Sequence, residues 1–259
     1  MLAQRVREAT SLPVEIGMRY GEPSFVQARE LLNDVCDEIL VISAYPHYAE
    51  STYESTVERL KHVFRGTRTL ITPPYFQDPA FIAAHGELLN EHLRPDVDHL
   101  VFSFHGVPEL HIRRADQSRR HCLQNGDCCE REHPTQATCY RFQCLRTAKL
   151  LRNRISIPTS VAFQSRLGPA KWLQPYTIDE VRRLAKNGVR NLAIACPSFI
   201  SDNVETLYEI GHEIREVFLH TGGKRLDVVP CLNESDAWVR LVVSWARNDN
   251  EKHVILNEI

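Results

Sequence analysis

The sequence predicts an α/β fold built on a parallel sheet. Short runs rich in β-branched residues alternate with longer segments that have the period of an amphipathic helix. The short runs are almost continuously apolar, as strands buried on both faces should be. Several of the longer segments open with Ser or Thr, which can accept hydrogen bonds from the free amides of a first helical turn. A strict alternation of strand and helix is typical of α/β proteins.

Each run can be assigned to an expected element. Gly188, in the stretch LAKNGVRN, is expected to end one helix directly before the next strand. The expected strands are residues 14–18, 38–43, 68–73, 99–104, 155–163, 191–196 and 225–230. The expected helices are residues 24–36, 51–64, 79–93, 135–153, 177–187, 201–221 and 235–248.

Composition narrows the class of protein. The 259 residues are 43% hydrophobic and 25% charged, with a net charge of -2, which is ordinary for a globular protein and argues against a nucleic-acid partner. The start of the chain, MLAQRVREATSLPVEIGMRYGEP, lacks the apolar core of a secretory signal, and no apolar run is long enough to span a bilayer. We therefore expect a cytoplasmic protein that at most touches the inner membrane peripherally.

The stretch HCLQNGDCCEREHPTQATCYRFQC, residues 121–144, holds five of the eight cysteines. In a reducing compartment, clustered cysteines favour metal binding over disulfides. The spacing C-x5-C-C-x9-C-x4-C lacks the two separate C-x2-4-C pairs that structural zinc sites usually show. The alternative is a polar surface insertion with free thiols.

Polar residues follow several of the expected strands, at the sheet edge where α/β proteins bind ligands. His105 ends a buried strand, and its neutral imidazole could accept a proton or bind a metal, although backbone bonds could equally satisfy it. Asp202 lies near an expected helix start, with Glu205, Glu209 and Glu213 after it at four-residue intervals. That spacing stacks the glutamates along one helix face, gathered for a cation or simply solvated.

These motifs, taken in order, resemble those of ferrochelatases, which insert ferrous iron into a porphyrin. The matching stretches are GMRYGEPS, YPHYAEST, FSFHGVPE, FQSRLGPAKWLQPYT, CPSFISDNVETLYE and, more weakly, VPCLN. The resemblance implies two Rossmann-like halves of a chelatase fold, residues 1–97 and 98–259, with the cysteine stretch inserted in the second. It also implies that the first half is incomplete, because ferrochelatases have a further strand, turn and lip segment before the point that Leu2 matches.

The resemblance also implies roles for individual residues. His105 is expected to accept pyrrole protons or pass on iron, with Glu205 facing it. Asp202, Glu209 and Glu213 are expected to line a route for metal entry or proton exit. The residues expected to bind the porphyrin are Arg19, Tyr20, Ser51, Trp172 and Phe199, with Arg19 suited to pair with a propionate. Ordinary core packing is the alternative for Trp172 and Phe199.

Some ferrochelatases carry a 2Fe-2S cluster, and one bacterial group draws its ligands from an internal segment at about this place, which this sequence resembles. Glu50 stands where animal-type enzymes have a ligand cysteine. A cluster needs four thiolates, so one cysteine is spare, and we expect it to be Cys128 or Cys129, whose side chains should point in different directions. The candidate ligands are Cys122, Cys128, Cys129, Cys139 and Cys144. The arginines expected to favour thiolates are Arg113, Arg114, Arg119, Arg120, Arg131, Arg141 and Arg146.

The expected reaction is insertion of Fe2+ into protoporphyrin IX, with release of two protons, in the last step of haem synthesis. The expected partners are the porphyrin and ferrous iron, with the chain acting as a monomer or homodimer. The alternatives are a coproporphyrin III ferrochelatase, a catalytically silent iron-sulfur or haem-binding relative, and a cobalt chelatase on a similar fold. Binding energy from the rest of the ring would have to drive its bending, at a cost of about 1–5 kcal/mol.

Overall fold

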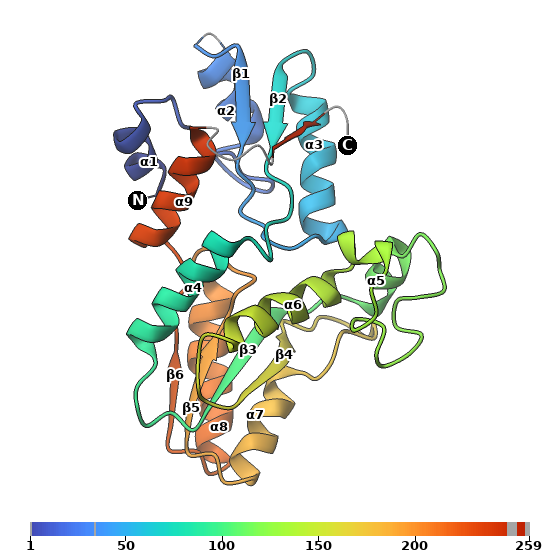
Figure 1. The fold of residues 1–259 in the computed structure, drawn as a ribbon, viewed down its shortest axis with the longest axis vertical. Coiled ribbons are helices and arrows are strands. Elements are labelled where there is room, and N and C mark those ends of the chain that lie inside the picture. The colour runs from blue at the N-terminus through green and yellow to red at the C-terminus, as the bar shows by residue number, and fades with distance from the viewer. Residues whose placement is uncertain (1, 34, 248–252, 257–259) are drawn as a thin grey trace. The chain divides into compact units, whose positions relative to one another are not determined.

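The structure, a computed structural model, describes residues 2–33, 35–247 and 253–256 (Figure 1). It consists of two compact units, Met1–Tyr75 with Glu234–Ile259 and Phe76–Asn233. This division lies at residues 75 and 76, the last part of the chain returns to the first unit, and the expected domain boundary near residue 97 stays a prediction.

Helix packing explains this division. Helix α4 (Pro79–His92) packs on α6 (Tyr140–Arg152) in the second unit. Helix α9 (Asp236–Ala246) packs on α1 (Leu2–Thr10) in the first. The expected end of α9 at Asn248 lies outside the described residues.

The first unit contains a mixed sheet of strand order β1-β2-β7. Strands β1 (Glu38–Val41) and β2 (Arg68–Ile71) are parallel, and β7 (Val254–Ile255) runs antiparallel to β2. The remaining helices of the unit are α2 (Phe25–Asn33), a π-helix at Glu50–Glu54 and α3 (Ser55–Val63). Their apolar faces meet the sheet in one core, where Leu60 and Ile71 are almost completely buried.

The expected strand at residues 14–18 does not form. Its only strand-like pairing among the described residues is an isolated bridge between Met18 and Ser24. Ile16 and Met18 are 46% and 45% exposed, rather than buried on both faces. A strand needs a neighbour to take its backbone hydrogen bonds, and among the described residues no strand runs beside this segment.

The second unit contains a fully parallel sheet of strand order β4-β3-β5-β6. Figure 1 shows α4 and α6 on one face of this sheet and α7 and α8 on the other, which is the layering of a doubly wound α/β fold. The strands are β3 (His99–His105), β4 (Thr159–Gln164), β5 (Asn191–Ala195) and β6 (Arg225–Val228), and the outer helices are α7 (Thr177–Lys186) and α8 (Arg215–His220). The predicted α/β class is confirmed.

The middle of this sheet is fully enclosed. Val101, Leu192 and Ile194 have no exposed surface and pack in one core with Val181 and Phe218 from the outer helices. At about 25 cal/mol per Å² of apolar area removed from water, such side chains supply much of the favourable free energy of folding. The core encloses the central strands, and His105 is the last residue of β3.

The helix boundaries follow local chemistry. Helix α4 begins at Asp78, whose carboxylate accepts from the amides of Ala80 and Phe81 at 2.9 and 3.3 Å. The expected helix at 201–221 is a π-helix at Glu205–Ile214 that continues into α8. The expected helix at 135–153 is a 3-10 turn at Pro134–Ala137 followed by α6, and a further helix, α5 (Glu109–Ala115), was not expected.

Among the residues described, none of the helices combines the length and the apolarity that a bilayer crossing demands.

A substitution at Ile194 tests how much the enclosed core of this sheet contributes to stability. We expect Ile194→Ala to lower the free energy of unfolding by about 2–5 kcal/mol, because it removes a fully buried side chain and leaves a cavity. Urea denaturation measures the change. Leu110→Ala is the control, because Leu110 is 53% exposed and should change stability by less than about 0.5 kcal/mol. Equal effects of the two substitutions would contradict the assigned core.

Candidate active site and cysteine segment

His105 lies where the strand order of the second unit reverses. Strand β3 lies between β4 and β5, and the connection that leaves its carboxyl end runs to β4, whereas the connection after β5 runs the opposite way, to β6. This is the position at which open α/β sheets bind ligands. Gly106 follows directly, and a Cβ there would stand 2.7 Å from the Gln164 carbonyl oxygen and 3.2 Å from the Trp172 ring. The glycine therefore allows the chain to turn with the imidazole at the sheet edge.

The imidazole of His105 is held in one orientation. Its Nδ1 lies 2.5 Å from the carbonyl oxygen of Gly106, which can only accept, so Nδ1 carries the proton of this bond. The other nitrogen, Nε2, lies 3.4 Å from Glu205 Oε1, and both side chains are 36% exposed. In the neutral imidazole, Nε2 therefore presents a free lone pair beside a carboxylate.

Glu205 changes the acidity of this histidine. Burial alone would lower the pKa of His105, but the hydrogen bond and negative charge of Glu205, with the Gly106 carbonyl and the charge of Glu209, raise the pKa above its usual value. The protonated form is thus stabilised by a partner within reach. A proton taken up at Nε2 would be held there as part of an ion pair.

The other acidic side chains have separate surroundings. Glu209 accepts from Ser165 through both the backbone amide, at 2.7 Å, and the hydroxyl, at 2.6 Å. Asp202 accepts from Asn233 at 2.7 Å and from Thr206 at 3.0 Å, which ties the start of the acidic segment to the loop after β6. Glu213 is exposed. Glu205 thus contacts the histidine, Glu209 acts on it through its charge alone, and the metal-route roles of Asp202, Glu209 and Glu213 stay predictions.

Two expected porphyrin contacts lie beside the histidine. The ring centroids of His105 and Phe199 are 6.1 Å apart, and Phe199 also packs against the core of the second unit. Trp172 forms a bridge with Pro108 and donates from Nε1 to the Leu167 carbonyl at 2.9 Å. Both aromatic side chains are half-buried, so each offers one surface to a ligand while the other packs.

The other expected contacts belong to the first unit. Arg19 donates from Nε to the Ser55 carbonyl at 3.1 Å, and its guanidinium lies 4.4 Å from the centroid of the Tyr20 ring. Tyr20 is 66% exposed, and Ser51 is exposed at the start of the π-helix that precedes α3. Their part in binding a porphyrin stays a prediction.

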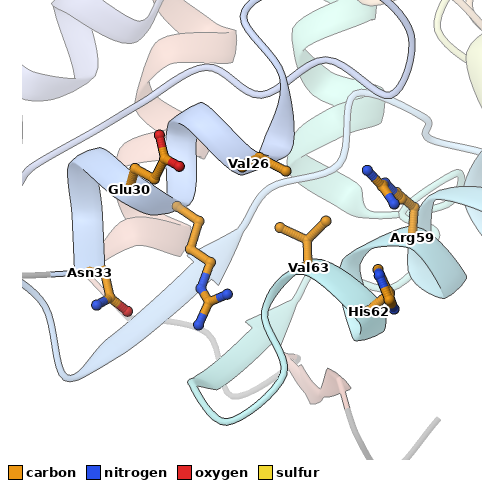
Figure 2. A pocket seen from close by; sticks show the side chains of 7 residues that line it. Val26, Glu30, Asn33, Arg59, His62 and Val63 are labelled. Atoms are coloured by element: carbon orange, nitrogen blue, oxygen red, sulfur yellow. The ribbon is translucent and has the colours of Figure 1, made fainter.

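Two surface cavities also lie in the first unit. One, of about 540 Å³, lies between α2 and α3 and is lined by Val26, Arg29, Glu30, Asn33, Arg59, His62 and Val63 (Figure 2). It contains none of the residues expected to bind porphyrin or iron. The second, of about 570 Å³, shares Arg59 and His62 with the first and includes Arg19.

The cysteine segment is organised by Asp116, at the end of α5. Its carboxylate accepts from the amides of Ser118, His121 and Cys122 at 2.8–3.0 Å and from the Ser118 hydroxyl at 2.6 Å. Burial would raise the pKa of Asp116, but these bonds outweigh it and lower the pKa to about 2. The ionised carboxylate thus fixes the loop that carries Cys122.

Four thiols of this segment lie near one another. The Cys139 thiol hydrogen-bonds with those of Cys122 and Cys129, and Cys128 Sγ lies 4.0 Å from Cys129 Sγ. The adjacent Cys128 and Cys129 therefore do not point apart as expected. Cys144 is fully buried and interacts with the Tyr140 hydroxyl instead.

The setting of these thiols favours thiolates at two positions. The hydrogen bond with Cys139 lowers the pKa of Cys122 to about 7. A hydrogen bond with Cys139 and the positive charge of Arg141 together lower the pKa of Cys129 to about 6. Arg141 lies 3.3 Å from Cys129 Sγ and 3.6 Å from Cys128 Sγ. Within the described part of the chain, no three Cys, His, Asp or Glu side chains are arranged as ligands of a metal ion.

Comparisons with known proteins decide the family. The sequence model of the ferrochelatase family matches residues 1–250. A ferrochelatase of Stutzerimonas stutzeri (strain A1501) is 40% identical over 257 residues, which cover 94% of this chain and 75% of the relative. The chain belongs to the ferrochelatase family. A ferrochelatase of Azotobacter vinelandii is likewise 40% identical, over 95% of this chain and 77% of its own length.

The fold is shared beyond the ferrochelatase family. The structure of SirB from Bacillus subtilis with Fe3+ aligns with a TM-score of 0.61 at 13% identity, over 95% of this chain and 86% of that chain. A second structure, the sirohydrochlorin chelatase SirB from Bacillus subtilis subspecies spizizenii with cobalt, aligns with a TM-score of 0.56 at 12% identity. At this identity the likeness shows the chelatase-like fold alone.

Several residues of the ferrochelatase site carried no clear signal in the sequence. Ser198 accepts from the His105 amide at 3.0 Å, and Tyr140 donates to the His105 carbonyl at 2.8 Å. Ser198 follows strand β5, so the rule that led to the other junctions could have found it. Tyr140 and Asp116 could not be found in that way, because their partners lie far away in the sequence or in an irregular loop.

Glu205→Gln tests the coupling between Glu205 and His105. His105 can accept a proton only when it is neutral, so activity should fall at low pH as the imidazole becomes protonated. Because the pKa of His105 is raised, this fall should be centred above about pH 6.5, the usual pKa of histidine. Glu205→Gln removes the negative charge beside His105 while the burial of His105 remains, so the pKa of His105 should decrease and the fall in activity should move to lower pH. The dependence of kcat/KM on pH measures it, with the exposed Glu216→Gln as control. If the fall in activity stays at the same pH in Glu205→Gln, Glu205 does not raise the pKa of His105.

Proposed function

We propose that this chain catalyses the insertion of Fe2+ into protoporphyrin IX, with release of two protons, to form protohaem at the end of haem synthesis. The observation that carries the proposal is the half-exposed pair of His105 and Glu205 at the strand-order reversal of a ferrochelatase-family chain. The cytoplasmic location, a peripheral contact with the inner membrane and a monomeric or homodimeric state stay predictions.

The geometry of His105 suits the removal of a pyrrole proton. With Nδ1 committed to the Gly106 carbonyl, the neutral ring can accept only at Nε2. The carboxylate of Glu205, 3.4 Å away, stabilises the imidazolium that forms. Because both side chains are 36% exposed, the proton can then leave to solvent. General acid-base catalysis of this kind contributes about 10²–10⁴-fold in rate.

The surroundings of the pair suit a flat apolar ligand. Leu167, Val204 and Leu207 are 79%, 72% and 63% exposed. Val204 and Leu207 flank Glu205 in the chain, and Leu167 lies on the loop after β4 whose Ser165 binds Glu209. Exposed apolar side chains around a few polar groups are typical of sites that bury a largely hydrophobic molecule.

We also propose that Cys122, Cys128, Cys129 and Cys139 bind a 2Fe-2S cluster. The donor set has the four thiols that such a cluster needs, brought near one another by Asp116 and by contacts centred on Cys139. The lowered pKa values of Cys122 and Cys129 favour the thiolates that bind iron. Cys144, buried against Tyr140, is then the spare cysteine. When bound, the cluster would supply one-electron redox chemistry or a covalent staple for the segment.

His105→Ala tests the catalytic proposal. We expect the unmodified protein to quench protoporphyrin IX fluorescence as Fe2+ or Zn2+ enters, and we expect His105→Ala to slow this by about 10²-fold or more because Nε2 is lost. The initial rate at saturating metal measures it, and coproporphyrin III in a parallel assay compares the alternative substrate. Glu216→Gln is the control. Equal rates for His105→Ala and the unmodified protein would remove His105 from the mechanism.

Single Cys→Ser variants test the cluster assignment. Anaerobically purified protein should show the visible absorption of a 2Fe-2S cluster with two iron atoms per chain. We expect Cys139→Ser to abolish this absorption and Cys144→Ser to retain it, because only the first removes a proposed ligand. Iron and zinc analysis of the same samples is the second measurement. Zinc in place of iron, or loss of absorption in Cys144→Ser alone, would overturn the assignment.

A further inference from the structure

Tyr140 links the cysteine segment to the active-site histidine. Its side chain is buried, with 6% exposed, and its hydroxyl donates to the carbonyl oxygen of His105 at 2.8 Å. Tyr140 is the first residue of α6 and directly follows Cys139, the residue that caps this helix. One hydroxyl therefore joins the end of the cysteine segment to the end of β3.

The backbone of His105 depends on this bond. The pairing between β3 and β5 ends at Phe102 and Ala195, so at His105 no strand residue of β5 takes part. The amide of His105 donates to the Ser198 hydroxyl at 3.0 Å, and the carbonyl accepts from Tyr140. Side chains thus satisfy both backbone groups of His105, while the Gly106 amide of the same peptide donates to the Gln164 carbonyl at 2.8 Å. Removing the Tyr140 hydroxyl leaves the His105 carbonyl without its donor and loosens this end of β3.

The position of Tyr140 depends in turn on the cysteine segment. The Cys139 thiol bonds with the thiols of Cys122 and Cys129, which belong to the loop that Asp116 fixes. The Tyr140 hydroxyl also interacts with Ser198 and with the Cys144 thiol inside α6. A displacement of Cys139 would therefore be transmitted by one peptide bond to the phenol that holds His105.

We propose that Tyr140 is a positioning residue through which the cysteine segment sets the alignment of His105 with Glu205. This inference rests on the proposed function, because it assigns the tyrosine to the proton-accepting pair. Tyr140 itself need not touch the porphyrin. Tyr140 restrains the backbone carbonyl of His105 and so sets the direction of His105 Nε2.

Tyr140→Phe removes the hydroxyl and keeps the ring. A small misplacement of a reacting group is costly, so we expect kcat for metal insertion to fall by about tenfold or more while KM for protoporphyrin IX stays within about twofold. The change from free-base to zinc-porphyrin fluorescence, measured with Zn2+ and protoporphyrin IX, gives both constants.

Tyr75→Phe is a matched control. Tyr75 is likewise buried, and its hydroxyl donates to the Ser43 carbonyl at 2.8 Å in the first unit, at a residue with no expected role in the reaction. Tyr75→Phe should lower the stability of the protein by about as much as Tyr140→Phe does, but it should leave kcat unchanged. Equal values of kcat for Tyr140→Phe and Tyr75→Phe would overturn the proposal.

An NMR measurement separates this inference from the proposed function. The imidazole ¹⁵N resonances of His105, assigned by comparison with His105→Ala, report the environment of Nδ1 and Nε2 without any substrate. We expect Tyr140→Phe to shift them and Tyr75→Phe to leave them unchanged. If the unmodified protein inserts no metal, the proposed function fails, while unshifted resonances in Tyr140→Phe would show that the positioning role fails by itself.

A double variant tests the transmission from the cysteines. Cys139→Ser should lower kcat in the unmodified background and have little further effect in Tyr140→Phe, because both changes interrupt the same connection. Cys36→Ser, in the first unit, is the control and should leave kcat unchanged in both backgrounds. If the decrease in kcat of the double variant equals the product of the decreases in the two single variants, the cysteine segment acts on His105 by another route.

Discussion

The hydrogen bond between His105 Nδ1 and the Gly106 carbonyl is the constraint on which the chemistry of the site depends. It fixes the tautomer, turns the ring and leaves Nε2 as the basic atom beside Glu205. The bond requires the chain to fold back immediately after β3, and a side chain at position 106 would collide with the Gln164 carbonyl and crowd Trp172. The parallel sheet, the glycine and the imidazole thus form one arrangement, in which the rigid core of the second unit fixes the direction of a lone pair.

The electrostatics of the site balance two opposing effects. Burial disfavours the charged imidazolium, while the charges of Glu205 and Glu209 favour it. The carboxylates have the larger effect because Glu205 lies only 3.4 Å from the ring and also hydrogen-bonds with it. Asp202 is engaged by Asn233 and Thr206 and serves to hold the acidic segment in place. The acidic residues of this segment therefore differ in role: Glu205 contacts the histidine, Glu209 binds Ser165 and acts on the histidine through its charge, and Asp202 shapes the backbone.

The sequence was informative where local chemistry decides the structure. Periodicity predicted the sheet of the second unit, and the rule that ligands bind at strand ends led to His105 and Glu205, because both depend on residues close together in the chain. The strand expected at residues 14–18 failed because a strand is defined by its neighbour, which composition cannot supply. The compact units that divide at residues 75 and 76 were not foreseen, because helix packing and the return of α9 to α1 are long-range events. The grouping of thiols around Cys139 could not be predicted either, since an irregular loop held by Asp116 sets their distances.

The return of the C-terminal segment to the first unit has a consequence for biosynthesis. The second unit is formed by one uninterrupted stretch, Phe76–Asn233, whereas the first needs both Met1–Tyr75 and Glu234–Ile259. As the chain emerges from the ribosome, every residue of the second unit leaves the exit tunnel before α9 does. The histidine-bearing sheet can therefore become compact during translation, while α1 must wait for its partner helix until after the whole second unit has emerged.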